Sequence, residues 1–141
     1  MRDVRLLLLV VVALTLTVAA LASASDGNPV RATMSTSSTK PLAGVPWRYT
    51  VVVEDRAGKP LAARMRLQAL SADAVVRCWK RTRFVACPSA SAGAWIAFTG
   101  KRTGVIRWPA LLAGEKLTFQ AIVVAGAQSL RLPAPVTVQL P

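Results

Sequence analysis

Cations and aromatic side chains surround the two cysteines of this chain, Cys78 and Cys87. Guanidinium and ammonium groups beside aromatic rings suit anionic polymers and sugars, because together they offer charged hydrogen bonds and stacking surfaces. The alternative is a hairpin tip in which the cations are solvated while Trp79 and Phe84 cover the core. The candidate residues for binding an anionic ligand in this first group are Arg77, Trp79, Lys80, Arg81 and Arg83.

A second basic group lies further along the chain and consists of Lys101, Arg102, Arg107 and Trp108. We expect residues 100–104 to form an irregular loop, and Trp108 with Pro109 to form a corner. Loops of a β-sandwich gather at its two ends. The two basic groups would form one surface if their loops share an end, and would otherwise be two separate solvated loops.

Residues that commonly carry catalysis are scarce. The chain has no histidine, which removes the usual general base and the commonest zinc ligand. The carboxylates beyond the N-terminal segment are scattered, so paired-acid chemistry has few candidates; they are Asp26, Glu54, Asp55, Asp73 and Glu115. The sequence contains no recognisable nucleophile–base pair, metal cluster or phosphate loop. We therefore expect a protein that is not an enzyme and that holds no cofactor or metal.

The first residues predict the compartment. Met1, Arg2 and Arg5 form a basic start, residues 6–20 are an apolar run, and residues 22–24 are small. This layout is typical of a secretory signal peptide over residues 1–24, with cleavage after Ala24. The alternative is an uncleaved membrane anchor, since a spanning helix needs about 20 apolar residues. We expect the remaining chain to be secreted or extracytoplasmic, at the cell envelope.

The two cysteines are predicted to pair with each other. An even number of cysteines in an exported chain favours a disulfide, and Cys78 and Cys87 lack the C-x-x-C spacing of redox-active pairs. Closing so small a ring stabilises a fold by about 2–3 kcal/mol in the chain-entropy account, and measured values are often lower.

The charge is strongly one-sided, with 18 Lys and Arg against 6 Asp and Glu, a formal net charge of +12. Such an excess attracts polyanions in a salt-dependent way. Outside a cell these are wall phosphate polymers, acidic polysaccharides, anionic lipid head groups and DNA. The alternative is that arginine on the outer face of a sheet supplies solubility alone.

Composition divides the chain after the predicted cleavage site. Residues 25–40 are rich in Ser and Thr and offer little to bury, so we expect a flexible linker. From Pro41 the hydrophobic period becomes two, and residues 41–141 form the predicted domain. Its length suits one domain with its own core.

Seven short strands are expected in that domain. They are the segments 48–55, 63–69, 74–79, 83–87, 93–99, 117–125 and 130–140. Alternation places Ala63, Met65 and Leu67 inside with Arg64 and Arg66 facing water. In the segment 93–99 we expect Trp95 to turn inward with either Ala97 or Phe98. The prolines at 133 and 135 lack amide donors and indicate an edge strand.

This pattern predicts an all-β fold, an antiparallel β-sandwich of about seven strands, with a barrel as the alternative. Residues 42–47, 55–60, 93–95 and 113–119 resemble turn and core segments of bacterial secreted immunoglobulin-like modules, especially single-domain ones behind signal peptides in actinobacteria. The likeness covers about residues 41–141. It implies an immunoglobulin-like sandwich and carries no catalytic residues. The chain differs from antibody domains in having no cysteine pair that spans the two sheets.

The function expected from these features is that of a noncatalytic secreted or cell-envelope module, structural or adhesive. Its basic loops would bind an anionic wall or matrix polymer, with no specific nucleic acid as partner. One alternative is a basic secreted effector acting at anionic membranes, which would need an exposed apolar patch beside the cations. Another is a surface domain tethered by an uncleaved signal segment.

Overall fold

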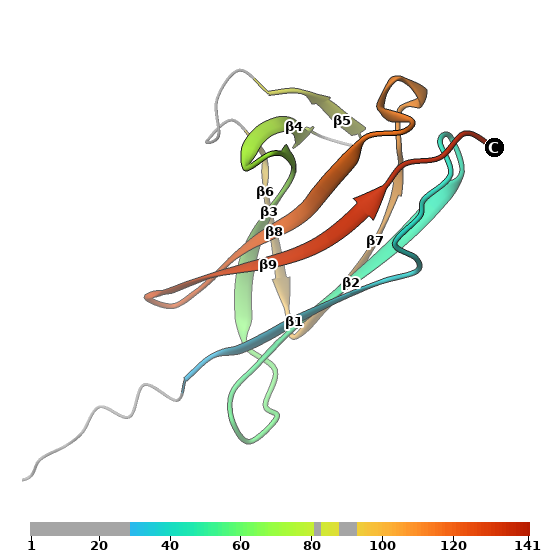
Figure 1. Ribbon diagram of the computed structural model, residues 1–141. Coiled ribbons are helices and arrows are strands. Elements are labelled where there is room, and N and C mark those ends of the chain that lie inside the picture. Colours follow the sequence, from blue (N-terminus) through green and yellow to red (C-terminus); the bar gives the residue numbers. More distant parts are fainter. Residues whose placement is uncertain (1–28, 81–82, 88–92) are drawn as a thin grey trace, which may run out of the picture.

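The computed structural model describes residues 29–80, 83–87 and 93–141, and in this part of the chain two antiparallel β-sheets face each other (Figure 1). The prediction of an all-β fold is confirmed. The strands, with one short 3₁₀ helix, are β1 (Arg31–Thr36), β2 (Pro46–Glu54), β3 (Ala62–Ser71), β4 (Ala74–Lys80), β5 (Arg83–Ala86), β6 (Trp95–Thr99), β7 (Lys101–Arg107), η1 (Ala110–Leu112), β8 (Lys116–Ala125) and β9 (Gln128–Thr137).

The smaller sheet has the strand order β1-β2-β7 and the larger one β5-β4-β3-β8-β9. The remaining strand, β6, joins the larger sheet beside the first half of β3, while β4 pairs with the second half. All of these pairings are antiparallel. Two separate sheets with free edges favour the sandwich over the barrel that was the alternative.

The core lies between the sheets and follows the alternation of the strands. Met65 and Leu67 of β3 face Val51 and Val53 of β2, and all four are fully buried. One end of this core is aromatic: the rings of Trp47, Tyr49, Phe84, Trp108 and Phe119 pack at centroid distances from 5.1 to 6.2 Å. Large aromatic side chains bury much apolar surface each, so this cluster contributes a large part of the buried apolar area at this end of the core.

The seven expected strands are present as β2 to β6, β8 and β9, within a few residues of their predicted bounds. The Pro-containing strand β9 lies at the edge of the larger sheet, as predicted. Two strands were not expected. The linker predicted over 25–40 is wrong for Arg31–Thr36, which forms β1, and the loop predicted over 100–104 is wrong because Lys101–Arg107 forms β7.

Both errors have the same physical cause. Strands β1 and β7 carry Ser, Thr or basic residues on the outer face and contribute few side chains to the core. Their sequences are therefore polar and resemble those of loops. In β1 the inward side chains Ala32 and Met34 pack only partly buried against the core. In β7 an inward position is taken by Gly104, which contributes no side chain at all.

Gly100 makes the corner where the chain leaves the larger sheet and enters the smaller one. Its N–H donates to the carbonyl of Leu61 (2.9 Å), and its carbonyl accepts from the N–H of Val53 (2.6 Å). Its φ is +70°, and a Cβ there would lie 2.7 Å from Pro60 Cβ. Glycine alone adopts this conformation without strain and leaves room for the proline.

The segments after β1 and after β9 run side by side at one end of the sandwich. Thr137 N–H donates to the carbonyl of Thr39, Gln139 N–H to that of Pro41, and Ala43 N–H to that of Gln139. The bridge between Leu42 and Gln139 is parallel. The two sheets are thus also joined along the side where β1 approaches β9 (Figure 1).

The predicted signal peptide over 1–24 and the first residues of the predicted linker lie outside the described residues. Within the part of the chain that the structure describes, no helix is long and apolar enough to cross a membrane.

Candidate functional site

The first basic group lies on the hairpin of β4 and β5. Cys78 and Cys87 are joined by a disulfide with a Cα–Cα distance of 5.2 Å, as predicted. Trp79 lies opposite Phe84, and their rings meet edge to face at 5.5 Å. Phe84 is buried and stacks on Trp108 at 5.4 Å, so the aromatic residues of this group face the core.

The cations of this hairpin divide between the two faces of the sheet. Lys80 and Arg83 lie opposite each other, both exposed, on the outer face, which is turned away from the smaller sheet. Arg77 pairs with Ala69 on the inner side and is half-buried. Arg81 lies outside the described residues.

The second basic group is split by the structure. Lys101 and Arg102 begin β7 beside Gly100, whereas Arg107 ends that strand at the opposite end of the sandwich. The Nη1 atom of Arg107 donates to the carbonyl of Gly44 (2.8 Å). Trp108 is 1% exposed and belongs to the core, so it offers no surface for stacking on a ligand. The two predicted groups therefore do not merge into one loop surface.

A different cation–aromatic cluster lies on the outer face of the larger sheet. The guanidinium carbons of Arg64 and Arg66, two residues apart on β3, lie 4.7 and 4.9 Å from the centre of the Trp95 ring. Trp95 is paired with Arg66 and is 41% exposed, so the expectation that it turns inward is wrong. The inward side chains of β6 are Ile96 and Phe98 instead.

The backbone before β6 explains why this cluster is ordered. A Cβ at Gly93 would lie 2.8 and 2.9 Å from Cγ and Cδ of Arg66, so the aliphatic part of that arginine runs over the glycine. The N–H of Ala94 donates to the carbonyl of Trp79 (3.0 Å), which ties the start of β6 to β4. Arg66 is thus held along its length, with its stem on Gly93 and its guanidinium over Trp95.

The same outer face carries further cations. Arg66 is paired with Ile122 of β8, which is paired with Arg131 of β9, so these side chains form a row across the sheet that begins at Trp95. We call the set on this face the basic face; it consists of Arg64, Arg66, Lys80, Arg83, Trp95, Lys116 and Arg131. Arg64 and Arg66 alternate with Met65, which predicts that they face water. That alternation is the sequence signal by which these two residues could be chosen as candidates.

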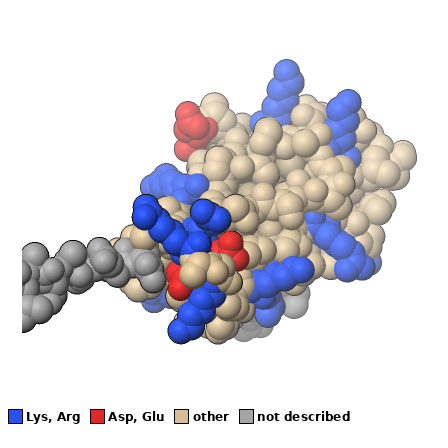
Figure 2. All heavy atoms as spheres, turned by 90° about the horizontal axis from the view of Figure 1, so that it is seen from below, with Lys and Arg blue, Asp and Glu red and all other residues tan. Residues whose placement is uncertain are grey.

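No carboxylate interrupts the described strands of this sheet. Every charged residue of β3, β4, β5, β6, β8 and β9 is Lys or Arg. The described carboxylates lie elsewhere: Glu54 ends β2, and Asp55, Asp73 and Glu115 are in connections. Viewed from below, Lys and Arg are spread over the visible face, and the few Asp and Glu side chains show at separate places (Figure 2).

Asp55 has a structural role. Its Oδ1 accepts hydrogen bonds from the N–H groups of Ala57 (2.8 Å) and Lys59 (2.9 Å), which closes the turn between β2 and β3. Asx turns of this kind occupy the side-chain oxygen with local backbone donors. The buried carboxylate is therefore accounted for by the turn.

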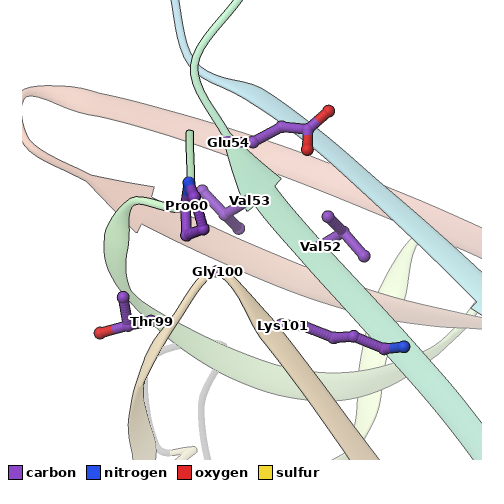
Figure 3. A pocket seen from close by; sticks show the side chains of 7 residues that line it. All are labelled: Val52, Val53, Glu54, Pro60, Thr99, Gly100 and Lys101. Carbon is purple, nitrogen blue, oxygen red and sulfur yellow. The ribbon is translucent and has the colours of Figure 1, made fainter. Parts of the chain in front are cut away.

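A hollow of about 260 Å³ lies where the end of β2 meets the turn between β6 and β7 (Figure 3). Its charged side chains are Glu54 and Lys101, and its other lining residues are Val52, Val53, Pro60, Thr99 and Gly100. A second hollow, of about 350 Å³, adjoins Arg64 on the basic face. Among the residues that the structure describes, no group of three or more Cys, Asp or Glu could hold a metal ion.

No protein-family model matches this chain, and no curated protein matches it. Among solved structures, it has a weak likeness to a β-glucosidase from Listeria innocua in complex with gluconolactone, with a TM-score of 0.29 and 12% identity. The match covers 79% of this chain and 17% of the glucosidase. A likeness at this level carries no argument about activity.

Proposed function

We propose that this protein is a noncatalytic, exported immunoglobulin-like module that binds an anionic wall or matrix polymer through the basic face. The observation that carries this proposal is the pair of arginines over the exposed ring of Trp95, on a sheet whose described strands hold only basic charges. It relocates the expected binding surface from the loops to the outer face of the larger sheet.

The chemistry of the cluster suits repeating carboxylate, sulfate or phosphate groups. Guanidinium groups form paired hydrogen bonds with such anions and remain charged at any physiological pH. Holding Arg64 and Arg66 against Trp95 lowers the side-chain entropy lost on binding, because the guanidinium groups are already positioned. Neighbouring strands lie about 4.8 Å apart, so Arg66 and Arg131, two strands apart, can contact successive charges of one chain.

The order of the strands supports the immunoglobulin-like type. In variable-type domains, which have nine strands, the first, second, sixth and seventh strands share one sheet. The third, fourth, fifth, eighth and ninth strands form the other. The orders β1-β2-β7 and β5-β4-β3-β8-β9 follow this plan. This chain departs from the plan at β6, which pairs with β3. It also has no cysteine pair between the sheets, and there the rings of Trp47 and Phe119 meet edge to face at 5.1 Å.

The disulfide supports the extracytoplasmic location. Disulfides persist in oxidising compartments and are rare in cytosolic proteins. The bond between Cys78 and Cys87 is consistent with export, as is the signal-like composition of residues 1–24. The polymers that such a protein meets are those of the cell envelope and its surroundings.

Matched charge variants test the proposal. Retention of the protein on heparin resin and on purified wall polymer is measured against salt for Arg64→Gln/Arg66→Gln and for the control Lys101→Gln/Arg102→Gln. Both variants lose two charges, but only the first alters the basic face. We expect the first to elute at clearly lower salt than the control, and Trp95→Ala to shift elution in the same direction. Equal elution of the two charge variants would mean that net charge alone drives retention.

A second function, action at anionic membranes, is favoured by one observation. Exposed apolar side chains gather at the end of the sandwich where the segments around Gly44, Gly114 and Gln139 are hydrogen-bonded together. They are Leu42, Val45, Leu111 and Leu140, of which Leu111 is 68% and Leu140 66% exposed. Sedimentation with anionic vesicles tests this function: Leu111→Asp should reduce binding strongly, while Arg64→Gln/Arg66→Gln should not.

A further inference from the structure

The outer edge of β7 is open in the part of the chain that the structure describes. β7 pairs with β2 on one side, and no described strand pairs with its other side. The cause is the corner at Gly100, which sends the preceding strand β6 to β3 of the larger sheet rather than alongside β7. A sandwich strand that would ordinarily have a neighbour here is left with unused backbone groups.

The register shows which backbone groups point outward. The bond from Val53 N–H to Gly100 O makes that pair hydrogen-bonded, and hydrogen-bonded pairs alternate along an antiparallel ladder. Gly104 and Ile106 are therefore bonded to β2, whereas Lys101, Thr103, Val105 and Arg107 direct their N–H and C=O groups to the open edge. Pro46, which has no N–H, lies opposite Arg107. This agrees with the alternation, which makes that pair one without hydrogen bonds.

We propose that the edge of β7 binds an extended acidic peptide segment, which adds a further strand to the smaller sheet. Adding a strand satisfies the outward backbone groups, and this mode of recognition takes its specificity from alternate side chains. Lys101, Arg102 and Arg107 are exposed at this edge, and Val105 is 42% exposed between them. A partner strand with carboxylates at its ends and β-branched residues in its middle complements that pattern.

The charges on β7 also disfavour the simplest alternative partner for this edge, which is β7 of a second copy of the protein. Two copies paired antiparallel about Gly104 would place Lys101 opposite Arg107 twice. Like charges directly opposite each other in a ladder are destabilising. Basic residues therefore protect this edge from self-association while leaving it attractive to an acidic strand.

The test uses the full mature protein and a capped peptide, Glu-Thr-Val-Thr-Val-Glu-Glu, whose residues would face positions 107 to 101 in that order. Methylating the peptide nitrogens at its two valines removes donors that would meet Thr103 and Val105. Methylating the nitrogens at its two threonines, which would point away, is the matched control. We expect the valine-methylated peptide to bind about tenfold or more weakly than the control, because two hydrogen bonds are lost.

Two measurements on the protein complete the test. Hydrogen exchange of Thr103 and Val105 should slow on binding the unmodified peptide, and Val105→Pro should weaken binding without removing a bond to β2. Equal affinity of the two methylated peptides would overturn the proposal, as would protection that appears only at Arg64 and Arg66. Dimerisation of the free protein through β7, seen by sedimentation and abolished by Val105→Pro, would assign the edge to a second copy instead.

Discussion

The ring of Tyr49 covers Gly104. The two residues are directly opposite in the pairing of β2 with β7, and a Cβ at position 104 would collide with the phenol ring. The tyrosine is 3% exposed, and its ring also meets Phe119 at 5.5 Å. An aromatic side chain laid over a glycine of the neighbouring strand restores the contacts that the glycine lacks. This pair therefore fills the core next to the open edge of β7.

Gly104→Ala should destabilise the fold by about 1–3 kcal/mol, because an added methyl group in a filled space forces the ring to move. Denaturant unfolding measures the loss. The added carbon would meet the oxygen and two ring carbons of Tyr49, so the same substitution should cost less in a Tyr49→Leu background, which removes all three atoms. An identical cost in both backgrounds would contradict the contact.

Burial raises the pKa of Tyr49, and the nearby charge of Arg102 partly opposes this shift by lowering the pKa. The phenol is neutral in both states below the pKa of the unfolded chain, about 10. As the pH rises from there through the folded pKa, ionisation favours the unfolded state, so stability should fall. Tyr49 is the single tyrosine, which makes phenolate absorbance a direct measure of its titration.

Two variants separate the loss of stability caused by Tyr49 ionisation from losses of stability at high pH that have other causes. Arg102→Gln removes the lowering influence and should move the titration of Tyr49 to higher pH. Tyr49→Phe should remove the part of the stability loss above pH 10 that the phenol causes. If phenolate forms at the pH of free tyrosine while the protein is still folded, the burial argument is wrong.

Much of the fold could be read from alternation. Strands such as β3 and β8 place an apolar side chain inward at every second residue, so their two-residue period is plain. β1 and β7 could not be found in this way, because a sandwich edge buries few side chains, and the inward position 104 is a glycine. Their place is fixed by pairing with β2, a long-range property that local composition does not report.

The candidate site was harder to predict than the fold. Trp79 and Trp108 lie close to cations in the sequence, but the strands turn both rings toward the core. The strand that contains Trp95, β6, has no Lys or Arg. Trp95 contacts Arg64 and Arg66 only because β6 pairs with β3. Cross-strand neighbours decide such a cluster, and a single sequence does not show which strands are paired.

Reduction of the disulfide should lower the free energy of unfolding by about 2–3 kcal/mol, because the ring closes over a sequence separation of 9. Denaturation with and without reductant measures the change. Mass spectrometry of the untreated protein should show it two hydrogens lighter than the reduced form. Two free thiols in the untreated protein would contradict the pairing.

The amides of Gln68 and Gln120 form a buried pair between β3 and β8. Nε2 of Gln68 donates to Oε1 of Gln120 at 2.7 Å, and within the described chain Oε1 of Gln68 has no hydrogen-bond partner. Gln120→Leu should cost about 1–3 kcal/mol, because it leaves the Gln68 amide unpaired as well. Replacing both by leucine should restore most of that loss. A double variant as unstable as the sum of the two single ones would show that the amides are not coupled.

The pairing of Thr39–Ala43 with Thr137–Gln139 has a consequence for the order of events during synthesis. Contacts at this side join distant parts of the chain. At the other end of β1 and β9, the bond from Val30 N–H to the Gln128 side chain likewise spans 98 residues. Such closures carry a large loop entropy and form late in folding. A chain emerging N-terminus first cannot join its sheets along this side until Gln139 has been made. That delay lengthens the time during which the polypeptide has not yet reached its complete native structure.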